Sequence, residues 1–196
     1  MSYDIDLVHK DTRETMKLPC PLFVRGGTVP AAVNPTIGRL EQAPTEEASI
    51  NITYNYASYY YEATDGDDRF RVVDEDGNVS YGIRGLYGKS ASESFVLLRD
   101  MINRIQEKYQ NPDGTWKMAE RTRTRWFDEA GREVHDAFAL GLRRQKLRKE
   151  TETYLISEGD VSNYWEATAL NAMLPLLHMR AMAALFVLDD CVWDGD

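Results

Sequence analysis

The chain has 196 residues, of which 43% are hydrophobic and 11% aromatic, so it can bury a substantial core and global disorder is not expected. Its formal net charge of −9 argues against a general DNA- or RNA-binding protein and against docking on anionic membranes, because both need surplus Lys and Arg. The length suits a single domain over residues 1–196.

The opening segment is predicted to form a β-hairpin. Apolar and polar residues alternate over residues 3–8, and the alternation resumes at Met16 and Leu18, which is typical of strands with one solvated face. A loop rich in Pro and Glu follows at residues 29–48. Such a loop is expected to be exposed or to form a lid over a binding site.

A strand is then predicted at residues 50–56, and its polar side is the most informative feature of the sequence. Alternation places Asn51, Thr53 and Asn55 on one face, opposite a row of Ile and Tyr side chains. Asn is uncommon in strands, so two of them beside a Thr indicate a polar surface that binds something.

Two helices are expected after a second hairpin, which pairs residues 69–73 with 79–83 around a turn at 74–78. The first helix begins at Ser90, because Ser90 and Glu93 have the spacing of a capping box and apolar residues follow at three- and four-residue steps. The second helix is capped by Thr168 and extends to about residue 188. Strands first and helices later indicate an α+β fold, with a small antiparallel sheet packed on two main helices.

Residues 110–160 are predicted to be an insertion in this domain, because they form the only stretch rich in Lys and Arg. A turn at residues 129–131 could close a hairpin that begins at Trp116, followed by a helix at about 134–149; one continuous helix is the alternative. The basic side chains could contact an acidic partner or nucleic acid, or form a solvated helix face.

The apolar segment at residues 169–188 is about as long as a membrane span. It contains Pro175 and Arg180, so a buried core helix is expected instead. The acidic N-terminal residues do not resemble a secretory signal, and Cys20 and Cys191 lack the spacing of a metal-ligand pair. A cytoplasmic protein with two unpaired thiols is therefore expected.

Residues 88–90 suggest an anion-binding site at the start of the first helix. Gly88 precedes Lys89 and Ser90, and free amides at a helix N-terminus attract anions; a capped helix with a solvated Lys89 is the alternative. Tyr54 and Trp165 offer flat faces for a nucleobase, although core packing or an oligomer contact would explain such aromatics too. No His has a partner at ligand spacing, so neither a metal site nor a cofactor is expected.

Several motifs together resemble a family of small phage and prophage-type proteins: NITYNY at 51–56, GIR at 82–84, YGK at 87–89, YW at 164–165, NA at 171–172 and VWDGD at 192–196. The resemblance covers the opening hairpin, the central strand and both main helices, but not residues 110–160. Leu170 stands where the family usually has Gly. The resemblance implies a phage-type origin and assigns no catalytic residue.

We therefore expect a non-catalytic binding protein of phage type that acts in the host cytoplasm as a homo-oligomer, for example against host defence. It would bind a host protein or sequester a small anionic or nucleotide-like signal. An enzyme acting on a nucleotide or phosphate ester, with a Tyr or His178 as acid–base group, and a structural or scaffold protein of the virion are the alternatives. The residues expected to line the pocket are Asn51, Tyr54, Asn55, Lys89, Ser90 and Trp165.

Overall fold

The computed structural model describes residues 2–22, 31–34, 39–42, 45–73, 76–134 and 146–195, and it has the expected α+β architecture. The strands are β1 (Ser2–His9), β2 (Lys17–Leu22), β3 (Ala31–Asn34), β4 (Arg39–Gln42), β5 (Thr45–Glu47), β6 (Ser49–Thr53), β7 (Val72–Val73), β8 (Val79–Ser80), β9 (Met118–Phe127), β10 (Arg148–Ser157) and β11 (Cys191–Gly195). The helices are α1 (Ala57–Thr64), α2 (Ala91–Tyr109) and α4 (Ala169–Leu185), with short 3-10 helices η1 (Tyr54–Tyr56), η2 (Asp68–Phe70) and η3 (Ile83–Leu86).

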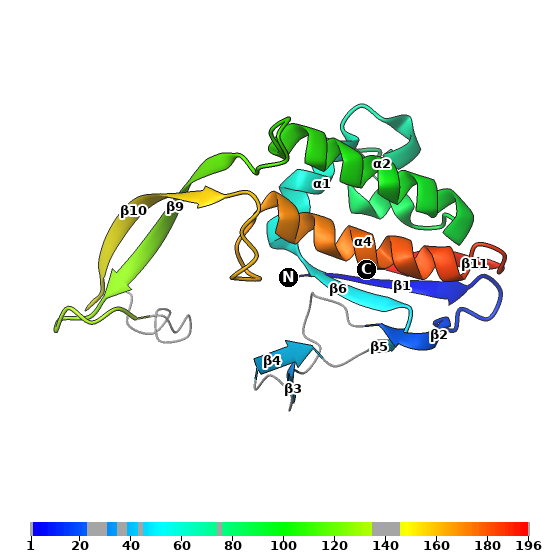
Figure 1. Ribbon diagram of the computed structural model, residues 1–196, viewed down its shortest axis with the longest axis horizontal. Coiled ribbons are helices and arrows are strands. Elements are labelled where there is room, and N and C mark those ends of the chain that lie inside the picture. The colour runs from blue at the N-terminus through cyan, green and yellow to red at the C-terminus, as the bar shows by residue number, and fades with distance from the viewer. Residues whose placement is uncertain are drawn as a thin grey trace.

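The body of the molecule has two layers, an antiparallel sheet in the order β11-β1-β6 and the helices α2 and α4 (Figure 1). The predicted alternation in β1 is confirmed: Tyr3, Ile5 and Leu7 are buried, whereas Asp4 is exposed. Their partners on β6 and β11 continue the apolar face, and the two long helices cover it. The core therefore lies between the sheet and the helices, as the sequence pattern predicted.

The strand predicted at residues 50–56 is too long, because β6 ends at Thr53. The Thr53 hydroxyl accepts a hydrogen bond from the backbone N–H of Asn55 and caps η1, which leads directly into α1. Ser and Thr side chains compete with sheet pairing in this way. As a result Asn51 and Asn55 do not share a strand face.

The predicted hairpins form only in part. After β1 the chain turns so that the N–H of Met16 donates to the carbonyl oxygen of Leu7, but β2 itself pairs with β5. The second hairpin is reduced to β7 and β8, and residues 74–75 of its turn lie outside the described residues. Within the predicted loop at 29–48, the described residues include strands β3, β4 and β5.

Both predicted helix caps are confirmed. The Ser90 hydroxyl accepts from the N–H of Glu93, whose carboxylate accepts from the N–H of Ser90, and Thr168 caps α4. Helix α4 ends at Leu185 and keeps Pro175 buried in its interior. Within the described part of the chain, no helix is both long and apolar enough to cross a membrane.

A strand that the sequence analysis missed, β11, completes the sheet beside β1. Its Trp193 is fully buried and donates from Nε1 to the hydroxyl of Ser94 at 2.7 Å. Residues 88–90 continue the sheet beyond β11, since the N–H of Gly88 donates to the carbonyl oxygen of Trp193 and the N–H of Trp193 donates to that of Lys89. Two of the motifs that carry the family resemblance, YGK and VWDGD, are therefore hydrogen-bonded to each other in the body.

Residues 118–157 form a long arm. The predicted hairpin is present only as its turn and an isolated bridge between Phe127 and Glu133, and β9 pairs along its length with β10. Strands β9 and β10 pair antiparallel over ten residues each and project from the body (Figure 1). A helix that reaches residue 149 is wrong, because Arg148 and Lys149 belong to β10; residues 135–145 lie outside the described residues. The predicted turn near residue 130 is present, with the N–H of Asp128 donating to the carbonyl oxygen of Arg132.

Candidate functional site at the base of the arm

The two Asn side chains that the sequence analysis singled out are both hydrogen-bonded within the chain. Asn51 lies on the outer face of the sheet, where its Nδ2 donates to the hydroxyl of Ser2 at 2.8 Å and to the carboxylate of Asp4. Asn55 is exposed in η1 and donates from Nδ2 to the backbone oxygen of Trp165 at 3.0 Å. Asn55 and Trp165 therefore lie together, and Asn51 lies apart from them.

Tyr54 packs at the edge of the body, with its ring edge-on to that of Tyr3 at a centroid distance of 4.2 Å. Its hydroxyl accepts a hydrogen bond from Nη2 of Arg84 at 3.1 Å. Trp165 is 62% exposed, so it is the one ring of the predicted pocket that is open to a partner.

Lys89 and Ser90 lie at the opposite edge of the sheet from Asn51. Three strand spacings separate β6 from the segment at 88–90, which is roughly 14 Å at about 4.8 Å per strand. The Ser90 hydroxyl is occupied in the capping box. The structure thus does not bring the six predicted residues into one pocket.

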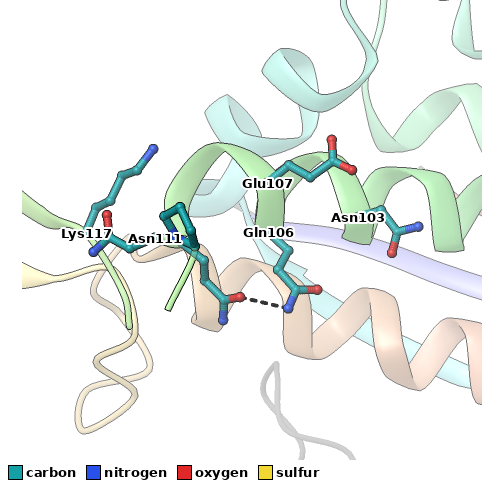
Figure 2. Close-up of a pocket in the computed structure, with 7 residues that line it drawn as sticks. Asn103, Gln106, Glu107, Asn111 and Lys117 are labelled. Carbon is teal, nitrogen blue, oxygen red and sulfur yellow. Dashed lines mark hydrogen bonds between the residues drawn. The ribbon is translucent and has the colours of Figure 1, made fainter. Parts of the chain in front are cut away.

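Two hollows instead adjoin each other where α2 ends and the arm begins. The first has a volume of about 480 Å³ and is open to solvent (Figure 2). Figure 2 shows Asn103, Gln106 and Glu107 along the last turns of α2, with Lys117 beside Asn111. Gln106 donates from Nε2 to Oε1 of Gln110 at 2.8 Å. The residues that line this first hollow are Asn103, Gln106, Glu107, Gln110, Asn111, Pro112 and Lys117.

The second hollow, of about 430 Å³, lies between α1, the end of α2 and the first residues of β9. It contains both carboxylates and cations: Glu62 accepts from Nζ of Lys108 at 2.9 Å and from the hydroxyl of Tyr109. Lys117 lines both hollows, and its Nζ donates to the backbone oxygen of Lys108 at 2.5 Å. Among the described residues Lys117 has no acidic partner.

A buried carboxylate joins the arm to the body at the floor of the second hollow. The Glu158 side chain is 2% exposed; its Oε1 accepts from Nη2 of Arg121 on β9 at 2.7 Å, and its Oε2 lies 2.7 Å from the hydroxyl of Tyr59 on α1. Oε2 also accepts from the N–H of Ala169, the first residue of α4, at 2.7 Å. One carboxylate thus connects β9, α1 and the N-terminus of α4, where the helix dipole favours negative charge.

Protonation at this site is set by burial and by these partners. Burial is the main reason that the pKa of Tyr59 lies well above its ordinary value, and the neighbouring Glu158 raises it further. The pKa of Tyr109 is raised in the same way, first by burial and then by Glu62. The hydroxyl of Tyr109 and then Lys108 lower the pKa of Glu62. At neutral pH both phenols are therefore protonated and Glu62 is ionised, which suits fixed hydrogen bonding better than proton transfer.

Sequence reasoning missed these residues because chain segments far apart in the sequence supply them. Glu158 precedes a Gly-Asp pair, which marked only a segment boundary in the sequence. One signal was available on α2, where Asn103, Gln106 and Gln110 recur at steps of three and four residues and so form a stripe of carboxamides.

No group of three His, Cys, Asp or Glu side chains in the described ranges is arranged to hold a metal ion. Cys20 is exposed and Cys191 is buried, and both are free thiols. Comparison of the chain with protein-family models, with curated proteins and with solved structures found no match.

Proposed function

We propose that this chain is a non-catalytic binding protein of phage type that acts in the host cytoplasm, and that its arm is the element that engages a protein partner. A role against host defence is consistent with the motif resemblance. The single observation that carries the proposal is the arm itself. A ribbon of two ten-residue strands projects from the body, and among the described strands β9 and β10 pair only with each other.

A contribution to the stability of the fold is a poor explanation for such a ribbon. A two-stranded sheet on its own is marginally stable in water, and unpaired strand edges invite pairing with other chains. Neither β9 nor β10 contains a proline or a register shift that would block an edge. Among the described residues the arm is tied to the body near its root, where Arg121 pairs with Glu158 and the hydroxyl of Tyr154 donates to Glu166 at 3.0 Å. The exposed length is therefore best suited to contact with another protein.

A shortened arm tests this proposal. Arg123 and Glu152 are cross-strand neighbours, so residues 124–151 can be replaced by an Asn-Gly turn without removing the joint at Glu158. Tagged wild-type and shortened proteins, purified from host cells, are compared by quantitative mass spectrometry. We expect a partner that is retained by the wild type and lost from the variant, with similar thermal midpoints. Equal retention by both proteins would contradict a role for the arm.

The two hollows favour a second candidate role, the binding of a nucleotide-like ligand at the base of the arm. Their volumes fall in the range of small-molecule sites. Carboxamides on one side can read the edges of a base, and Lys117 between the hollows can contact a phosphate. In this proposal these carboxamides and Lys117 would supply the chemistry that was expected of Asn51, Asn55 and Lys89.

Native mass spectrometry and calorimetry with a panel of mononucleotides and cyclic dinucleotides test this role. Lys117→Ala should weaken binding by about tenfold or more, because it removes a charge-assisted contact. Lys89→Ala is the matched control, since it removes the same charge at the other edge of the body and should bind like the wild type. Absence of binding across the panel, or a larger loss in Lys89→Ala, would contradict the site.

A further inference from the structure

The two faces of the arm differ in composition because the strand register sorts the side chains. Cross-strand pairing places Thr122 opposite Thr153 and Thr124 opposite Thr151 on one face. The full set on this face, called the threonine face below, is Met118, Glu120, Thr122, Thr124, Trp126, Lys149, Thr151, Thr153, Leu155 and Ser157. The arginines of β9 point to the opposite face.

The arginine side is occupied by ion pairs: Arg121 pairs with Glu158 at the joint to the body, and the other two arginines of β9 pair within the arm. Arg123 pairs with Glu152 at 3.0 Å and lies over the ring of Tyr154, and Arg125 pairs with Glu133. Within the described ranges, no ion pair joins the side chains of the threonine face to one another. Its four Thr side chains are exposed, Leu155 is 67% exposed and Met118 is 60% exposed. An exposed strand surface with apolar side chains is typical of a contact surface.

The charges on the threonine face have a symmetric arrangement. Glu120 lies near the root of the arm and Lys149 near its tip. Each is three cross-strand pairs away from the central pair, Arg123 and Glu152, and the position of a pair along the ribbon is called its level below. Neither Glu120 nor Lys149 has an ion pair with another described residue. Along the strand they are about 20 Å apart, at roughly 3.4 Å per residue, so they cannot pair within one chain. A two-fold rotation about the central level exchanges the level of Glu120 with that of Lys149.

We propose that the threonine face packs on the threonine face of a second copy of this chain, antiparallel, around a two-fold axis at the level of Arg123 and Glu152. This inference rests on the binding role proposed for the arm and names its partner. The axis brings Glu120 within reach of Lys149 of the second copy, twice in the dimer, and sets Thr122 against Thr124 of the second copy. Leu155 meets Trp126 of the second copy diagonally across the same interface.

Self-association fits this face better than other partners. With one Glu and one Lys the face is neutral overall, so it offers no surplus positive charge for a nucleic acid or an anionic membrane. Stacking gives each ribbon the second layer that a two-stranded sheet lacks, with small Thr side chains that allow close approach. The symmetric charges make the face complementary to itself, as a two-fold interface requires.

Charge reversal with rescue tests the dimer on the full chain. Sedimentation equilibrium should show a dimer for the wild type, and Glu120→Lys or Lys149→Glu should each raise the dimer dissociation constant by about tenfold, because each sets like charges together twice. The double variant restores both pairs and should return to within about threefold of the wild type. Since the two residues do not touch within one chain, a folding defect would not be rescued in this way.

Three outcomes would overturn the inference: a wild type that stays monomeric at the highest soluble concentration, a dimer that both single reversals leave unchanged, or a double variant as weak as the singles. The shortened-arm comparison in host cells is independent of these results. A monomeric wild type that still retains a host protein through its arm would refute self-association and leave the proposed function in place.

Discussion

The body and the arm of this protein are stabilised by different kinds of interaction. In the body, β1, β6 and β11 bury an apolar face under α2 and α4, and Trp193 and Tyr60 are completely inaccessible. In the arm, ion pairs and Arg–aromatic contacts connect side chains that are mostly half exposed. The body therefore carries the stability of the fold, and the arm presents surface.

The largest expected effect breaks the body. Trp193→Ala leaves a cavity beneath the sheet and removes the indole N–H that donates to the Ser94 hydroxyl, so we expect the free energy of unfolding to fall by about 4–5 kcal/mol. Urea denaturation followed by circular dichroism measures this change. Leu188→Ala is the control, because Leu188 is 97% exposed and its loss should cost less than about 0.5 kcal/mol. Similar midpoints for the two variants would contradict the assignment of stability to the body.

The next effect concerns the joint between the two regions. Glu158→Ala leaves Arg121 and the buried hydroxyl of Tyr59 without their carboxylate, so we expect a loss of about 3 kcal/mol. Hydrogen exchange should also rise at the root of β9 and β10 before the core exchanges. Glu150→Ala, which removes a carboxylate that is 45% exposed, should change little. Unchanged exchange at the root would show that the arm is anchored elsewhere.

The same comparison explains what the sequence could predict. The caps at Ser90 and Thr168 and the alternation in β1 depend on neighbouring residues, so local patterns were sufficient. The pairing of β11 with β1 joins the two ends of the chain, which no local pattern reports. The strand predicted through the Asn-x-Thr-x-Asn segment was too long because Thr53 caps a 3-10 helix. Such a cap is a local alternative to strand pairing, and it has the same residue pattern.

The candidate site was the least predictable part for the same reason. Glu158 is buried only because β9, α1 and α4 meet around it, and Lys117 gains its position from the turn that ends α2. Composition marked residues 110–160 as distinct, and this segment is indeed where the arm lies. The sequence therefore set this segment apart, but it placed the candidate site elsewhere, on residues such as Asn51, Asn55 and Lys89.

The body also contains an ion network, in which Asp67 pairs with Arg69 and Arg104, and its strength can be compared with that of the arm. Hydrogen bonds from Arg69 and then Arg104 lower the pKa of Asp67 well below its ordinary 3.8. A lowered folded pKa stabilises the fold fully above about pH 4, and this contribution is lost as the pH falls through the folded pKa. Asp67→Asn should cost about 1 kcal/mol at pH 7, since both arginines are more than a third exposed and solvent screens the pair.

Urea denaturation at several pH values measures this effect. The stability difference between wild type and Asp67→Asn should be constant from pH 7 to about pH 5 and should shrink below pH 4. Asp65→Asn is a suitable control on the same loop, because no ion pair joins Asp65 to another described residue. A difference that grows on acidification would have the wrong sign for a lowered carboxylate pKa.

The smallest effect separates the arm from the body most cleanly. Arg123 is 52% exposed and its partner Glu152 is 44% exposed, so Arg123→Ala should change global stability by less than about 0.5 kcal/mol. Its effect should be local, with faster hydrogen exchange near Thr122 and Thr153. Raising the salt concentration to 0.5 M should loosen the wild-type ribbon in the same way and leave the body unaffected, because salt screens exposed pairs but not apolar burial. A ribbon whose exchange stays unchanged in high salt would show that these exposed ion pairs contribute little to its stability.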